Sequence, residues 1–135
     1  MKLTARRQAR ELALQILFQT EFAPQISYQT FLDVFEQSVD PEVISYADLL
    51  VTGVQSNKAA IDSKIQASSA HWKVERMATI DRNILRVAVY EMKFAADPIK
   101  ENIAINEAVE IAKKFGTTES ASFVNGLLDQ VGKAH

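Results

Sequence analysis

Residues 104–131 read AINEAVEIAKKFGTTESASFVNGLLDQV, and this stretch is the most informative about the fold. Apolar residues recur over 102–115 on almost every side of a helix, which predicts a central, buried helix there. Gly116 stands where a C-terminal glycine cap belongs. A last helix is expected over about 118–131, so two helices joined by a short polar turn close the chain.

The rest of the chain repeats this helical pattern. Apolar residues at three- and four-residue spacing predict further helices at 4–22, 28–37, 41 to about 54, 59–67 and about 80–92. Asp40 followed by Pro41 is a good N-cap and first helical position. Gly53 is expected to allow close contact between helices. With 47% apolar residues, four Gly and three Pro in 135 residues, the sequence predicts an all-α, single-domain bundle of about seven helices spanning 1–135.

Composition narrows the cellular setting. The chain has no cysteine, which excludes disulfides and fits a reducing compartment. No apolar run approaches the roughly 20 residues that span a bilayer, and the basic start lacks the cleavage signal of a secretory peptide. We therefore expect a cytoplasmic protein that does not engage a membrane.

Charge is unevenly distributed along the chain. The first ten residues contain four cations and no acid, whereas the whole chain has 15 Lys plus Arg and 17 Asp plus Glu. No Lys or Arg occurs between Glu11 and Lys58, although this part of the chain holds several acids. Such segregation suggests that the N-terminal end meets an anionic partner.

The four N-terminal cations are Lys2, Arg6, Arg7 and Arg10. If Thr4 caps the first helix, arginines occupy a first turn that already carries positive dipole charge, which is unfavourable until an anion binds. Lys2, Arg6 and Arg10 follow one line along the helix, with Arg7 beside it. This line could contact several phosphates, and reversing its charge is expected to leave the fold intact. Alternatively, the segment is a solvated basic helix end, or Arg10 pairs with an acid of another helix.

The sequence gives little support to an enzyme. Its two histidines lie 64 positions apart, and it contains no glycine-rich phosphate loop or nucleophile motif. Glu107 and Glu110 lie one helical turn apart, as in some carboxylate metal sites, but no Glu-x-x-His partner accompanies them. We expect them to be surface or salt-bridge residues, facing Arg86 or Lys113. We expect no catalytic activity, no metal site and no cofactor.

Three stretches resemble the NusB family of transcription antitermination factors: TARRQARELALQILFQ at 4–19, ATIDRNILRVAVYEM at 78–92, and the opening stretch at 104–131. The resemblance covers essentially the whole chain. It implies an all-helical fold that binds single-stranded boxA RNA of nascent ribosomal RNA transcripts. It also implies a protein partner, the small-subunit ribosomal protein NusE, and assembly into an antitermination complex with RNA polymerase.

The resemblance also implies site residues. Arg6, Arg7 and Arg10 match the family's arginine-rich motif, and Phe123 matches an aromatic implicated in RNA contact. An exposed Phe123 could stack on an unpaired base, but it could equally be a core residue. Asp81 and Arg82 match a position near the NusE-binding surface.

Other interpretations of several residues, and of the function, are possible from the sequence. Gln8 departs from family members that have arginine there, which points to weaker phosphate affinity. Arg82 and Arg86 could instead form internal salt bridges, the reading we favour for Arg86. A second function is also conceivable: a helical interaction domain whose basic first helix docks an acidic protein surface or a second copy of the chain.

Overall fold

The protein is helical throughout the parts that the structure describes. The structure is a computed structural model that describes residues 3–27, 29–30, 33 and 39–134. These residues form the α-helices α1 (Leu3–Phe22), α3 (Pro41–Ser56), α4 (Lys58–Ser68), α5 (Thr79–Val89), α6 (Glu101–Phe115) and α7 (Ser120–Lys133). Two short turns complete them: a 3-10 helix, η1 (Val74–Arg76), and a π-helical turn, η2 (Tyr90–Phe94).

The predicted all-α fold is confirmed, with six α-helices in the described ranges where about seven were expected. The helix predicted at 28–37 falls mostly outside the described residues. Within the described ranges, no helix is both long enough and apolar enough to cross a membrane.

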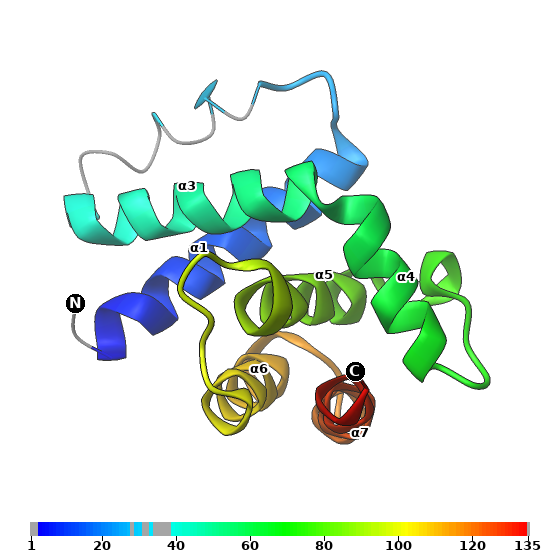
Figure 1. The fold of residues 1–135 in the computed structure, drawn as a ribbon. Coiled ribbons are helices and arrows are strands. Elements are labelled where there is room, and N and C mark those ends of the chain that lie inside the picture. The colour runs from blue at the N-terminus through cyan, green and yellow to red at the C-terminus, as the bar shows by residue number, and fades with distance from the viewer. Residues whose placement is uncertain (1–2, 28, 31–32, 34–38, 135) are drawn as a thin grey trace.

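Helix α5 is the centre of the bundle. It packs against α1 and α4 and also against α6 and α7, and Figure 1 shows it between the α1–α3 pair and the α6–α7 pair. Every residue from Asn83 to Met92 is buried, through the end of α5 and into η2. The centre of the fold is therefore the segment 83–92.

The prediction that residues 102–115 form the central buried helix is wrong. Helix α6 lies at the periphery and buries one face, made of Ala104, Glu107, Ala108, Ile111 and Ala112. Its other face is open to solvent, and Ile103 on it is 41% exposed. Helix α6 has more apolar residues than its one packing face needs. This excess led to the prediction that the helix is buried on all sides.

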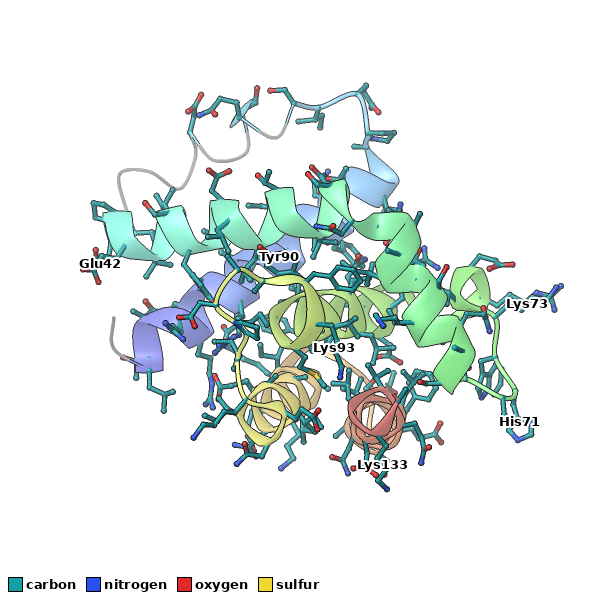
Figure 2. The ribbon with its side chains drawn as sticks, viewed as in Figure 1. Glu42, His71, Lys73, Tyr90, Lys93 and Lys133 are labelled. Atoms are coloured by element: carbon teal, nitrogen blue, oxygen red, sulfur yellow. The ribbon has the colours of Figure 1, made fainter. Side chains whose placement is uncertain are left out.

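Two local predictions about α3 are confirmed. The Asp40 carboxylate accepts a hydrogen bond from the Glu42 backbone N–H at 3.1 Å, and Pro41 is the first helical residue. A Cβ on Gly53 would overlap the ring of Tyr90, which lies between α3 and α5 (Figure 2). Gly53 therefore lets η2 approach α3 closely.

Gly116 is the C-cap residue of α6, as predicted, and its N–H donates to the Ala112 carbonyl oxygen at 2.9 Å. Its φ is −92°, so it is not a left-handed glycine cap. A Cβ there would overlap the side chain of Ser120, whose hydroxyl accepts a hydrogen bond from the Thr117 N–H at 2.9 Å. The glycine makes room for this tight turn between α6 and α7.

Candidate nucleic-acid interface

The N-terminal turns of α1 carry the arginines singled out from the sequence. Lys2 lies outside the described residues. The helix is already formed at Leu3, so Thr4 lies within it and does not cap it, and the first described turn contains no acid. Arg6 and Arg7 are partly exposed, whereas Arg10 is buried with 3% of its surface accessible.

Arg10 is the centre of a buried ion-pair network. Its Nε and Nη2 donate to the two carboxylate oxygens of Glu91 at 2.8 and 2.9 Å, and its Nη1 donates to Glu107 at 3.0 Å. Glu91 is 1% exposed and Glu107 is 3% exposed. Such fork-to-carboxylate pairing is the strongest and most directional hydrogen bonding that arginine makes. The network ties α1 to η2 and to α6.

Arg7 extends this network to the surface. Its Nε donates to Glu107 at 3.2 Å and its Nη2 donates to the other oxygen of the same carboxylate. The Arg7 side chain is 39% exposed while that of Glu107 is 4% exposed. One edge of the Arg7 guanidinium is therefore held by the protein, and the remaining donors are available to a ligand.

Arg6 and Tyr46 complete the arrangement. The Arg6 guanidinium lies over the Tyr46 ring, 5.3 Å from its centroid, in cation–π geometry. The Tyr46 hydroxyl donates to Glu91 at 2.6 Å. The Arg6 Nε is enclosed and has no hydrogen-bond partner among the described residues.

Electrostatics hold Glu107, Arg7 and Arg10 in their charged forms and the Tyr46 phenol in its neutral form. Burial opposes ionisation of Glu107, but the hydrogen bond and charge of Arg7, together with Arg10, hold the pKa of Glu107 below its usual value. The hydrogen bond from Arg7 to Glu107 raises the pKa of Arg7. For Arg10, burial lowers the pKa, but the hydrogen bonds and charge of Glu91 outweigh it and the net pKa is raised. Burial and the neighbouring Glu91 carboxylate raise the pKa of Tyr46, so the phenol stays protonated.

Arg7 and Arg10 both have internal acidic partners, which argues against the expectation that the charge of this helix end can be reversed with the fold intact. The alternative that Arg10 pairs with an acid of another helix is the one observed. Glu107 and Glu110 were expected to be surface or salt-bridge residues facing Arg86 or Lys113. Glu110 does pair with Lys113 at 3.3 Å, whereas Glu107 is buried and pairs with Arg7 and Arg10. Reversing the charge of Arg10 would place three carboxylates together in the core, so the fold is not expected to survive it.

Phe123 falls between the two alternatives considered for it. It lies on the first turns of α7, is partly buried, and packs against the core. The Lys114 side chain is exposed at the end of α6, where its Nζ pairs with Glu11 of α1 at 2.8 Å. This pair joins α6 to the exposed side of α1, next to the arginines.

Asp81 and Arg82 lie on the first turn of α5 and face different surroundings. Arg82 is turned inward: it pairs with Glu21 and donates to the carbonyl oxygens of Glu75 and Met77 at 3.2 and 3.1 Å. Arg82 is therefore a brace between α1, η1 and α5, the internal salt bridge considered as its alternative. Asp81 has one enclosed carboxylate oxygen with no hydrogen-bond partner among the described residues.

Arg86 is buried and forks onto Asp62 of α4 at 2.8 and 3.0 Å. The internal role favoured for Arg86 is confirmed. The burial of Glu91 and its pairing with Arg10 escaped sequence reasoning. Their only local signal was a single acid inside the apolar run VAVYEM.

Fold and surface together define a small all-helical protein whose first helix presents arginines anchored by buried carboxylates. The NusB family model matches residues 7–133. The transcription antitermination protein NusB of Bdellovibrio bacteriovorus is 90% identical over 135 residues, covering 100% of both chains. The chain belongs to the NusB family of transcription antitermination factors.

Solved structures agree with this assignment. NusB of T. maritima has a TM-score of 0.86 and 36% identity, covering 96% of this chain and 92% of that chain. A crystal structure described as the antitermination factors NusB and NusE in complex with double-stranded RNA contains a chain with a TM-score of 0.83 and 25% identity. That match covers 99% of this chain and 100% of that chain.

Proposed function

We propose that this antitermination factor binds single-stranded boxA RNA of nascent ribosomal RNA transcripts, in the cytoplasm and together with NusE. In that role it supports an RNA polymerase complex that passes termination signals. The observation that carries the proposal is the exposed, anchored guanidinium of Arg7 beside Arg6, on a first helical turn without an acid. The related complex of NusB and NusE with double-stranded RNA supports NusE and RNA as the two classes of partner.

The roles within the site follow from burial. Arg7 and Arg6 contact phosphates, with Lys2 as a further candidate from the sequence, because phosphate contacts supply most sequence-independent affinity. Arg10 has a structural role in the site and does not contact phosphate, since its donors are already used by Glu91 and Glu107. Phe123 offers the exposed part of its ring to a base.

The partner surface is separate and centres on Asp81. Asp81 is only partly buried on the first turn of α5, and the oxygen of its carboxylate that is not enclosed could accept a hydrogen bond from a basic partner such as a ribosomal protein. Arg82 shapes this surface from inside rather than contacting the partner, because its donors are satisfied internally. Self-association remains an outcome that gel filtration of the protein with and without NusE and RNA would reveal.

Arg7→Ala tests the RNA assignment. The affinity for a boxA oligonucleotide is measured over a salt series, beside a scrambled RNA and a boxA duplex. Loss of one phosphate contact should weaken binding and reduce the slope of log affinity against log salt by about 0.7. Lys73→Ala is the matched control because Lys73 is an exposed cation on the loop after α4, far from the N-terminus in Figure 2.

Two results would count against the proposal. An unchanged salt slope in Arg7→Ala would remove Arg7 from the RNA contact. Equal affinity for boxA and scrambled RNA would favour the alternative function, in which the basic helix docks an acidic protein surface or a second copy.

A further inference from the structure

Glu107 presents a contradiction for a surface that binds RNA. It places a carboxylate directly against Arg7, where a phosphate is to bind, and like charges repel. Glu107 is almost completely buried, so water screens this repulsion poorly. If Arg7 acted only as a positive charge, the site would bind RNA better without Glu107.

The geometry indicates what Glu107 contributes. Its two oxygens receive both Nε and Nη2 of Arg7, which fixes the plane of the guanidinium and leaves Nη1 unpaired by the described residues. Arginine is a long, flexible side chain, but its planar fork becomes directional once one edge is held. A free Arg7 would have to give up this freedom upon binding, whereas the held one has already lost it.

Glu107 is itself fixed from the core. Arg10 donates to its Oε1 at 3.0 Å and is in turn clamped by Glu91 of η2 at 2.8 and 2.9 Å. Tyr46 of α3 donates to Glu91 at 2.6 Å. The orientation of Arg7 is therefore fixed by a chain of contacts that reaches three packed elements other than its own helix: α6, η2 and α3.

We propose that Glu107 is a positioning residue for RNA binding: it increases affinity for an anionic ligand by holding Arg7 with its free donors toward the phosphate. The inference rests on the proposed contact between Arg7 and RNA. It assigns a favourable role to an acid at the centre of an RNA site.

Charge and positioning predict opposite signs for Glu107→Gln. Removing a negative charge should tighten RNA binding if only the net charge matters. If Glu107 positions Arg7, the variant should bind boxA RNA about threefold to tenfold more weakly at equal salt. Glu110→Gln is the matched control, because it removes the same charge one turn away on α6 from a residue that pairs with Lys113. It should bind RNA as well as the unmodified protein or better.

A second variant keeps the proposal testable if Glu107→Gln does not fold. Arg7→Lys keeps the charge and leaves the Arg10–Glu107 pair in place, but an ammonium cannot make the two-pronged contact. It should also lose about threefold to tenfold in RNA affinity, and adding Glu107→Gln to it should cause no further loss. Unchanged RNA affinity in Arg7→Lys, or equal or tighter binding by folded Glu107→Gln, would overturn the proposal.

Failure of this inference is distinguishable from failure of the proposed function. If Arg7→Ala weakens RNA binding but folded Glu107→Gln does not, only the positioning role is lost. If Arg7→Ala binds RNA as the unmodified protein does, the RNA contact itself is refuted, and the positioning role with it.

Discussion

Replacing Arg10 by alanine should destabilise the protein strongly, although the residue looks like a surface cation in the sequence. Among the residues that the structure describes, the change leaves Glu91, which is 1% exposed, with the Tyr46 hydroxyl as its one side-chain partner, and it leaves Glu107 with Arg7. Removing one partner of a buried ion pair costs about 3–5 kcal/mol because the other charge stays buried. Against a typical total of about 5–15 kcal/mol, this is a large fraction of the stability.

The size of the effect can be checked by unfolding. For a domain of this length, each kcal/mol corresponds to about 3–5 °C in Tm, so Arg10→Ala should melt about 9–25 °C lower. Circular dichroism during heating and urea titration measures this loss. Arg7→Ala is the control: its side chain is 39% exposed, and its loss should cost about 1 kcal/mol or less. If Arg10→Ala lies within about 1 kcal/mol of the unmodified protein, the buried network does not hold α1 in place and the reasoning fails.

Three further outcomes are expected. Phe123→Ala should lower stability by about 1–3 kcal/mol because the ring is partly buried, and it should lower RNA affinity because the exposed part of the ring is proposed to stack on a base. A thermal melt and an RNA titration measure the two effects, and loss of only one would assign Phe123 to the core alone or to the RNA surface alone. Asp81→Lys should weaken binding of purified NusE with little effect on RNA alone, and equal NusE affinity would remove Asp81 from the partner surface. The pKa values of Glu107 and Glu21 lie below 4.5 in the fold, so their stabilising effect is complete above that pH and is lost as pH falls through the folded values. Urea midpoints should therefore fall as the pH is lowered below about 4.5, less steeply in Glu107→Gln, and parallel pH profiles would contradict this.

The sequence predicted those features of the fold that are governed by neighbouring residues. Asp40 and Pro41 marked the start of α3 because a cap and a fixed φ act within one turn. Gly53 predicted a close contact because a glycine inside a helix has no side chain and leaves room for a neighbouring element. Helix α6 was misplaced to the centre because periodicity measures how apolar each face is, not which neighbour covers it.

The candidate site was predictable in its location but not in its internal pairing. The absence of acids among the first ten residues indicated an anion-binding end, and this location is retained in the proposal. The partners of Arg7 and Arg10 lie 81 to 100 positions further along the chain, where no local rule connects them. Glu91 and Glu107 are both buried, and the buried Arg10 pairs with both of them.

The separation of these partners has a consequence for synthesis. The arginines of α1 leave the ribosome before their partners, because Glu91 lies 81 positions after Arg10 and Glu107 lies 100 positions after Arg7. A nascent chain that ends before α6 contains Glu91, the partner of Arg10, but lacks Glu107, the carboxylate that orients Arg7. The arginine surface proposed to bind RNA is oriented only when Glu107 has joined the fold, so a product truncated before α6 lacks that oriented surface even though it contains every arginine of α1.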